Sequence, residues 1–115
     1  MTIKQKQWQL YYLGYYGGEI DGIWGAQSKA ATVRFQKDNA LETDGIFGAL
    51  AAEKSIEIIK TIQKEITDGK IAIDGLAGLE TKDATLQWQR ENSLTPDGIA
   101  GSMTREKIKK SNTAK

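Results

Sequence analysis

The stretch Asp21-Gly22-Ile23-Trp24-Gly25 decides the fold, because the same pattern returns three more times along the chain. Each copy reads Asp-Gly-aliphatic-x-Gly, and eight of the 12 glycines lie in these four Asp-Gly motifs. The glycines therefore occupy set positions and do not form a flexible linker. The later copies are Asp44-Gly45-Ile46-Phe47-Gly48, Asp74-Gly75-Leu76-Ala77-Gly78 and Asp97-Gly98-Ile99-Ala100-Gly101.

The spacing of the motifs indicates an internal duplication. Their Asp residues are 23, 30 and 23 positions apart, so the first pair maps onto the second with one offset of 53 residues. At this offset Phe35 aligns with Trp88, and Gln36 aligns with Gln89. The first stretch of each unit matches poorly, and we expect a one-residue shift in the loop that precedes the first motif of a unit. The chain is therefore predicted to contain two related units.

Helical periodicity predicts an all-α fold. A short helix is expected over residues 8–13, a second along the apolar stripe of residues 28–35, and the longest over residues 49–67. Two more are expected near residues 79–92 and 102–109. The predicted architecture is two pseudo-repeated three-helix units that share or fuse the central helix. The units would span residues 1–53 and 54–109, followed by a polar tail or linker over residues 110–115.

The residue types of the motif predict tight turns. Asp accepts a backbone N–H two residues on, and Gly adopts positive φ without steric cost, which we expect at Gly22 and Gly75. We expect the aliphatic third residue to fill the core, and Asn39 to take a left-handed conformation after its helix. Hydroxyls in the first turn of the next helix would cap free N–H groups. These hydroxyls are Ser28, Thr81 and Thr104, while Phe35 and Trp88 are expected in the core.

The composition excludes several classes of function. The 115 residues contain no Cys and no His, which removes Cys nucleophiles, Ser-His triads, disulfides and the usual zinc or haem sites. Lys and Arg number 16 against 15 Asp and Glu, so no nucleic-acid partner is expected. The mean hydropathy is -0.49, and no apolar run approaches the ~20 residues of a membrane span. We expect no membrane partner, cofactor, metal or signal peptide.

Two chemical alternatives use the acidic residues. Calcium-binding proteins also duplicate Asp/Gly loops, but calcium needs several oxygen ligands, and each motif offers one carboxylate. Glu19 and Asp21 lie close enough in sequence to form an acid/base pair, yet Ala72 replaces Glu19 in the second unit. The sequence favours turn chemistry over both, and no catalytic residue is predicted.

A longer string of residues now identifies a family. The string consists of residues 9–25, Ser28, residues 31–36, residues 39–41 and residues 44–48. It resembles the peptidoglycan-binding-like domain, a three-helix cell-wall module attached to many bacterial and phage peptidoglycan hydrolases. The family pattern has Leu-Gly-Tyr, Asp-Gly-x-aromatic-Gly, Ala-x-x-x-Phe-Gln, Asn-Gly-Leu and a second Asp-Gly motif. The second unit matches from Asp74 through Ala84, Trp88-Gln89, Asn92 and Leu94 to Gly101.

The chain departs from the family pattern at a few positions. The family's Gly after Asn is Ala40 and Ser93 here, and the motif aromatic is Trp24 in the first unit but Ala77 in the second. The resemblance implies a non-catalytic module that binds the glycan strand or stem peptide of peptidoglycan and anchors an attached catalytic domain. It implies a place at the bacterial cell wall or outside the cell, including release from the cytoplasm as a phage or prophage endolysin. Both units could bind, or one could serve as support.

The uneven distribution of aromatic residues suggests where the ligand binds. Six aromatic residues of the first unit have small or charged counterparts in the second, and six rings exceed what a unit of this size is expected to bury. Aromatic rings with a polar edge suit contact with sugars and peptides. The predicted ligand-binding residues are Tyr15, Tyr16 and Trp24, with Gln27 and Arg34 as polar contacts. The alternative is a duplicated helical protein-interaction or structural module without glycan affinity, which should expose an apolar patch.

Overall fold

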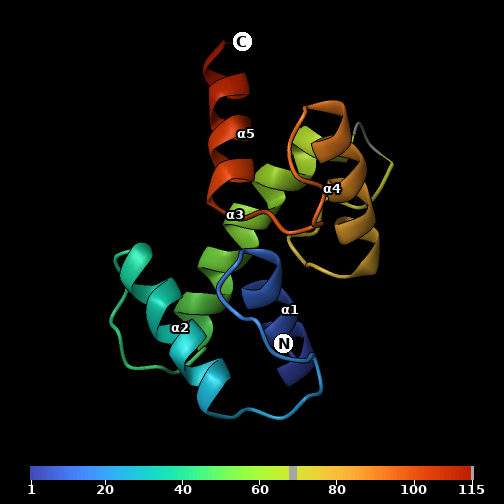
Figure 1. Cartoon of the computed structure of the whole chain (residues 1–115). Helices are drawn as coiled ribbons and strands as arrows, with labels where there is room; N and C mark the ends of the chain where they lie inside the picture. The colour runs from blue at the N-terminus through green and yellow to red at the C-terminus, as the bar shows by residue number, and fades with distance from the viewer. Residues whose placement is uncertain (68–69, 115) are drawn as a thin grey trace.

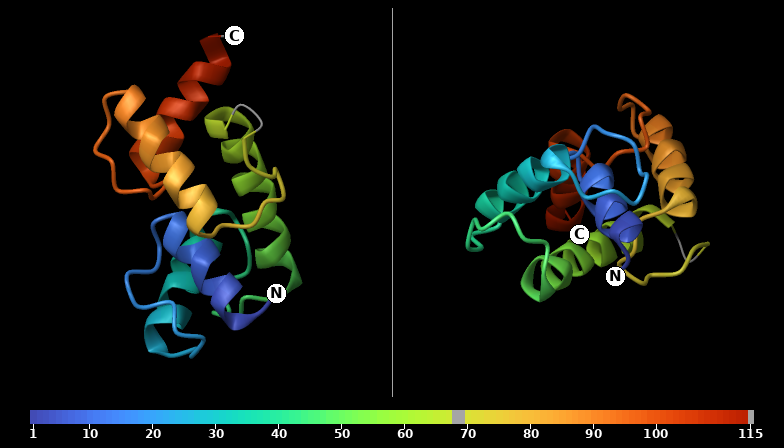
Figure 2. Two further views of the ribbon diagram at one scale, coloured as in Figure 1. Left: turned by 90° about the vertical axis from the view of Figure 1, so that its right-hand side faces the viewer. Right: turned by 90° about the horizontal axis from the view of Figure 1, so that it is seen from below.

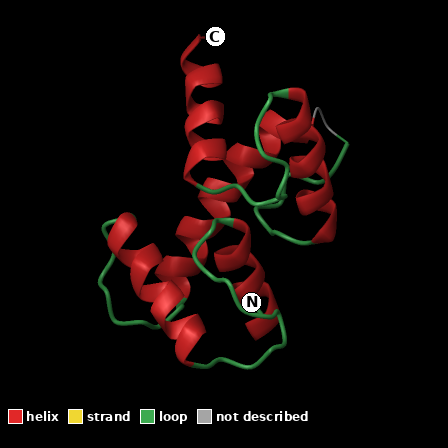
Figure 3. Ribbon diagram, in the orientation of Figure 1, coloured by secondary structure: helices red, strands yellow, loops and turns green. Residues whose placement is uncertain are grey.

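The computed structural model describes residues 1–67 and 70–114, with side chains given up to residue 110. This part of the chain contains five helices and no strand (Figure 3). The predicted all-α fold is therefore confirmed. The helices are α1 (Ile3–Tyr12), α2 (Ala26–Asp38), α3 (Ala49–Thr67), α4 (Leu79–Glu91) and α5 (Ser102–Ala114).

Helix α3 is the shared central element (Figure 1). Helices α1 and α2 pack together beside its N-terminal half, and α4 and α5 contact its C-terminal half (Figure 2). One uninterrupted helix thus closes the first unit and opens the second, as the periodicity of residues 49–67 predicted. Helix α3 crosses the expected division between residues 53 and 54, and this division of the chain into two units remains a prediction.

Two helices are longer than the sequence indicated. Helix α1 begins at Ile3 and not near residue 8, because the Thr2 side chain accepts a hydrogen bond from the backbone N–H of Gln5 at 3.1 Å and caps it. The buried side chains Gln7 and Gln9 give this helix an inner face that apolar periodicity does not detect. Helix α5 continues to Ala114, past the predicted end at residue 109, and residue 115 lies outside the described residues.

A buried glutamine holds each Asp-Gly motif, in an arrangement that we call the glutamine clamp. In the second motif, Gln36 Oε1 accepts the backbone N–H of Gly45 at 3.0 Å. Gln36 Nε2 donates to Asp44 Oδ1 at 2.9 Å and to the carbonyl oxygen of Ile46 at 3.0 Å. Asp44 Oδ1 also accepts the N–H of Ile46 at 2.9 Å, which is the predicted Asx-turn. The other three motifs repeat these bonds with Gln7, Gln63 and Gln89.

The clamp decides which motif residue enters the core. Because the Asx-turn ties the third residue back to the Asp, its side chain points outward, and Ile23 is 70% exposed. The fourth residue is turned inward, and Phe47, Ala77 and Ala100 are all buried. The expectation that the third residue fills the core is therefore wrong.

The first-turn hydroxyls also have a different role from the predicted one. Glycines occupy the N-cap positions of α2 and α4, and no side chain caps these two helices. The hydroxyls are buried and lie against the clamps: Gln63 Nε2 is 3.1 Å from Thr81 Oγ1, and Gln89 Nε2 is 3.0 Å from Thr104 Oγ1. The predicted capping by Ser28 and Thr81 is wrong for this reason, and capping by Thr104 stays a prediction.

The clamps also fix the register between the units. Gln36 and Gln89 are equivalent at the offset of 53, whereas Gln7 and Gln63 are 56 residues apart and make equivalent bonds. The loop between glutamine and motif is therefore three residues shorter in the second unit. The expected one-residue shift is therefore wrong. Apolar residues could not reveal the correct alignment, because the inner faces of the two helices that carry Gln7 and Gln63 are polar there.

The positive-φ positions follow the turns. Gly22 has φ +79° and Gly75 has φ +74°, as predicted, and Phe35 and Trp88 are buried in the core, as predicted. Asn39 has φ -109°, so its expected left-handed conformation is wrong. Its Nδ2 instead donates to the carbonyl oxygen of Phe35, and the next residue, Ala40, takes the left-handed conformation at φ +57°.

Helix α1 joins the two units into one body. One of its faces carries Gln7 and belongs to the first unit, while Gln9 reaches the second unit. Gln9 Nε2 donates to the carbonyl oxygen of Gly75 at 2.9 Å, and its Oε1 accepts the N–H of Ala77 at 2.8 Å. At the end of α1 the carbonyl oxygen of Tyr12 accepts the N–H of Ala100 at 2.7 Å. The two units are therefore joined by the contacts of α1 as well as by the shared helix α3.

The clamp predicts a large effect for Gln36→Ala. The change leaves the buried N–H of Gly45 and the carbonyl of Ile46 without their partner, so the free energy of unfolding should fall by about 2–4 kcal/mol. Urea denaturation followed by circular dichroism measures this. The control is Gln87→Ala, an exposed glutamine that bonds Glu91 on the same helix and should change stability by less than about 0.5 kcal/mol. Equal losses in the two variants would contradict the role of the clamp.

Two glycine substitutions should differ in cost. A Cβ at residue 22 would lie 3.4 Å from the flexible Lys4 side chain, but one at residue 75 would lie 2.7 Å from the backbone oxygen of Ile56. Gly22→Ala should destabilise by about 1 kcal/mol through its positive φ alone. Gly75→Ala adds a clash with backbone and should cost about 3 kcal/mol or more. Thermal and urea unfolding test this order, and a larger loss at residue 22 would refute it.

Ala40→Gly should stabilise the protein. A left-handed alanine costs about 1–2 kcal/mol, and glycine removes that strain while losing part of the gain to unfolded-state entropy. The expected net gain is about 0.5–1 kcal/mol in urea unfolding. The same change at the exposed helical residue Ala30 should instead cost about 1 kcal/mol. A loss of stability in both variants would show that residue 40 is not strained.

Candidate functional site

Four of the five predicted ligand-binding residues lie along one side of α2. Gln27 and Arg34 are exposed and seven residues apart, which places them two turns apart on one helix face. The loop of residues 15–18 runs beside this face. Arg34 Nη2 donates to the carbonyl oxygen of Tyr15 at 2.6 Å, which holds the start of the loop on the helix.

Tyr15 is a core ring with a hydrogen-bonded edge. Its side chain is 9% exposed, and its ring packs edge-on against Phe35 with centroids 5.5 Å apart. Its hydroxyl donates to Asp38 Oδ2 at 2.8 Å. Burial and this bond to Asp38 raise the pKa of the Tyr15 hydroxyl. On its other side lies Arg105 of α5, whose guanidinium carbon is 5.7 Å from the ring centroid.

Tyr16 is also buried, and it supports the far end of the loop. Its side chain is 7% exposed, and its hydroxyl donates to the carbonyl oxygen of Glu19 at 2.6 Å. A Cβ at Gly18 would lie 2.5 Å from Gln27 Oε1 and 2.7 Å from the Tyr16 hydroxyl, so loop and helix are in close contact there. Glycine at position 18 permits this approach.

Trp24 stands apart from the two tyrosines. It is partly exposed at the start of α2, and its ring centroid lies 6.3 Å from that of Phe47. Phe47 stacks on Phe35 at 6.1 Å, and Phe35 contacts Tyr15. The four rings thus form a row through the first unit, with Trp24 at one end and Tyr15 at the other.

Most of the aromatic rings of the first unit are buried. Tyr12 and Phe47 are 0% and 3% exposed, and Tyr15 and Tyr16 are almost as deeply buried. Four of the six rings are thus buried, whereas Tyr11 and Trp24 stay partly exposed. The second unit helps to bury them, since the Tyr12 hydroxyl meets Thr85 Oγ1 at 2.8 Å. Of the five predicted residues, Gln27 and Arg34 are exposed and Trp24 is partly exposed.

The carboxylates near this surface are committed to turns. Asp21 Oδ1 accepts the N–H of Ile23 at 2.9 Å and a bond from Gln7 Nε2 at 3.2 Å. The N–H of Ile23, followed by Gln7, lowers the pKa of Asp21, and the N–H of Ile46 does the same for Asp44. Asp21 therefore stays ionised near neutral pH and does not suit the role of a general acid beside Glu19. Among the described residues, no group of three His, Cys, Asp or Glu side chains could hold a metal ion.

Sequence reasoning missed two sets of important residues. It paired Gln36 with Gln89 but assigned neither a role, and it did not recognise Gln7 or Gln63. Gln36 and Gln89 each precede the Asp of a motif by eight residues, a regularity that could have indicated a common partner. Arg105 was also missed, since nothing in its local sequence indicates that it reaches Tyr15 and the carbonyl oxygen of Leu13.

The fold and its four clamped turns define a tandem helical module, and comparison with known proteins identifies its class. The family described as "Putative peptidoglycan binding domain" matches residues 2–53 and, a second time, residues 59–108. The chain therefore belongs to this family and carries two copies of the domain, as its resemblance predicted.

A curated protein also matches part of the chain. The spore cortex-lytic enzyme of Oceanobacillus iheyensis is 32% identical over 62 residues, which is 54% of this chain and 22% of that enzyme. The match thus spans about a fifth of the relative's length. No solved structure matches the chain. Within the described residues, none of the helices has the length and apolar character needed to cross a membrane.

Proposed function

We propose that this chain binds peptidoglycan without cleaving it and thereby anchors an attached cell-wall hydrolase to its substrate. The observation that carries the proposal is the tandem family match, which covers nearly the whole chain. The relative that matches is a lytic enzyme by name, and most of that enzyme lies outside the match. An anchor of this kind raises the effective concentration of the attached enzyme at an insoluble substrate.

The state of the acidic side chains supports binding without catalysis. Each motif aspartate accepts two hydrogen bonds through one oxygen, in a geometry that shapes the backbone. Such carboxylates are positioned as structural acceptors and not as a proton donor and nucleophile facing a common cleft. The module would therefore depend on its partner domain for hydrolysis, at the cell wall or outside the cell.

We place wall contact on the outer surface of α2 in the first unit. Trp24, Gln27 and Arg34 supply a partly exposed ring and two polar groups, and Tyr15 and Tyr16 position the adjoining loop from beneath. A ring face suits the apolar face of a sugar, and a guanidinium suits carbonyl and carboxylate oxygens. The second unit would mainly support this surface.

Sacculus binding tests this surface. Purified peptidoglycan sacculi should pull down the chain, and Trp24→Ala and Arg34→Gln should each weaken binding about tenfold or more, as expected for central aromatic and arginine contacts. Gln87→Ala, at an exposed position of α4, is the control and should bind like the parent chain. Tyr16→Phe keeps the buried ring but removes the bond to Glu19, and it should have an intermediate effect.

Three outcomes would contradict the proposal. Absence of sacculus binding by a folded chain would refute the function itself. Unchanged binding by both the Trp24 and the Arg34 variant would show that the binding site lies elsewhere on the molecule. Release of reducing sugars or free amines from the wall by the purified chain would show catalysis. The melting temperature of each variant is measured as well, so that unfolding is not mistaken for the loss of a contact with the wall.

A specific observation also favours a second candidate, a protein-interaction module. Several aliphatic side chains beside the motifs are exposed, and Ile46 at 66% and Leu50 at 68% border a hollow of about 220 Å³ near Leu41. Exposed aliphatic groups of this kind suit a protein partner. Failure to bind sacculi, together with association to a catalytic domain, would favour this candidate.

A further inference from the structure

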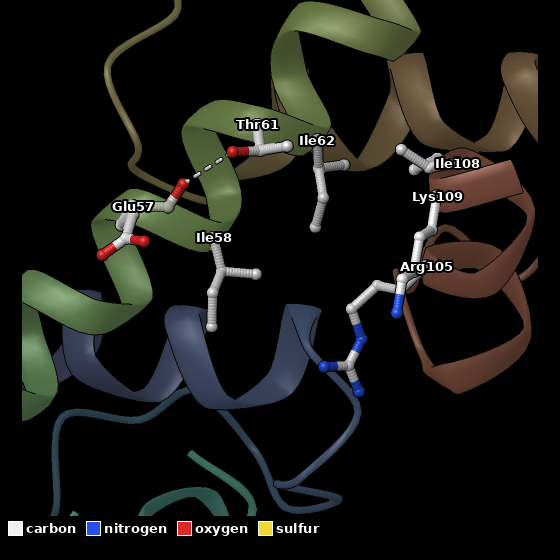
Figure 4. Close-up of a pocket in the computed structure, with 7 residues that line it drawn as sticks. All are labelled: Glu57, Ile58, Thr61, Ile62, Arg105, Ile108 and Lys109. Atoms are coloured by element: carbon white, nitrogen blue, oxygen red, sulfur yellow. Dashed lines mark hydrogen bonds between the residues drawn. The ribbon is translucent and has the colours of Figure 1, made fainter. Parts of the chain in front are cut away.

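A groove of about 420 Å³ lies between α3 and α5, on a different part of the molecule from the α2 surface (Figure 4). Ile58 and Ile62 point into it from α3, and Ile108 lies across from them on α5. The volume is at the smaller end of the range of about 300–1,000 Å³ found for small-ligand sites. Its remaining lining residues are Glu57, Thr61, Arg105 and Lys109.

Arg105 gives the groove a polar group that the fold does not fully use. Its side chain extends from α5 toward the end of α1 (Figure 4), where Nη2 donates to the carbonyl oxygen of Leu13 at a long 3.4 Å. Its Nε is buried and has no hydrogen-bond partner among the described residues. Buried N–H groups nearly always have a partner, so this one indicates a place for an acceptor.

We propose that the groove binds a short peptide that carries a carboxylate and small apolar side chains, which is the chemistry of the stem peptides of peptidoglycan. The planar guanidinium of Arg105 presents parallel N–H groups that match a carboxylate. The apolar part of the peptide packs on the partly exposed Ile58, and the buried Ile62 and Ile108 form the rest of the apolar lining. The proposal rests on the proposed function, since the wall is the source of the peptide.

The charge of the groove favours an anion over a cation. Two cationic side chains, Arg105 and Lys109, line it, against the single carboxylate of Glu57. Glu57 is 72% exposed and pairs with Lys54 at 3.8 Å, so it lies at the rim. The lining contains no aromatic ring on which the apolar face of a sugar could stack. The lining therefore favours a peptide over a glycan strand.

The groove depends on the fusion of the two units. Its walls come from α3 and α5, while Arg105 is positioned by Tyr15 and Leu13 of the first unit. The bond between Ala100 and Tyr12 fixes the start of α5 against the end of α1. An isolated three-helix unit would lack this support, so the site belongs to the tandem arrangement.

Titration with stem peptides tests the proposal. Peptides released from sacculi by an amidase are added to the whole chain, and binding is followed by calorimetry and by competition with sacculi. Binding should weaken at least tenfold in Arg105→Gln, with Arg90→Gln, at an exposed position of α4, as the control of equal charge change. Glu57→Gln should strengthen binding two- to threefold by removing a like charge, and Glu91→Gln should have no effect. An N-acetylglucosamine tetramer should not compete.

The outcomes separate this proposal from the proposed function. If the parent chain binds sacculi but the released peptides neither bind nor compete, the groove proposal is overturned and the wall function stands. If Arg105→Gln binds the peptides like Arg90→Gln, or if Glu57→Gln weakens binding, the proposal is also overturned. Self-association that Arg105→Gln abolishes, without peptide binding, would assign the groove to a second copy and overturn the proposal. Because Arg105→Gln could reduce stability, the exposed Glu57→Gln variant provides an independent test.

Discussion

The hydrogen bonds from a buried glutamine amide to an Asp-Gly turn are the interaction on which the rest of the structure depends. An amide side chain offers an acceptor oxygen and two donor N–H groups, so one side chain can satisfy a glycine N–H, a backbone carbonyl and a carboxylate at once. In this protein the glutamine lies on a helix and the turn follows that helix in the chain. Each clamp therefore fixes where the next helix begins, and four clamps in sequence position α2, α3, α4 and α5.

A further glutamine extends the same chemistry across the boundary between the units. Gln9 of α1 bonds Ser55, Gly75 and Ala77, so a first-unit helix holds a turn that Gln63 also holds from within the second unit. Two glutamines on one turn leave little freedom for the units to move relative to one another. The α2 surface and the groove between α3 and α5, both proposed binding sites, consequently keep a fixed separation.

The sequence predicts those features that depend on local chemistry. The Asp-Gly turns, the positive φ at Gly22 and Gly75, and the long central helix all follow from residue type and spacing. Features that depend on polar burial were not predictable in the same way. Hydrophobic periodicity treats Gln7 and Gln63 as surface residues, so it misplaced the start of α1 and the register between units. The outward direction of Ile23 likewise depends on a turn whose partner is distant in sequence.

The aromatic asymmetry illustrates how a packing constraint can resemble a binding signal. The fourth motif residue is Trp24 or Phe47 in the first unit, where Phe47 packs on Phe35 in the core and the partly exposed Trp24 packs on Phe47. In the second unit it is Ala77 or Ala100, and both are buried against α1: the N–H of Ala77 bonds Gln9, and the N–H of Ala100 bonds the carbonyl oxygen of Tyr12. A large ring at either position would compete with α1 for this space. The rings are therefore absent where α1 packs and present where a separate core must be filled. The uneven distribution of aromatics follows from the fusion of the units, and a binding role for Trp24 depends on its partial exposure.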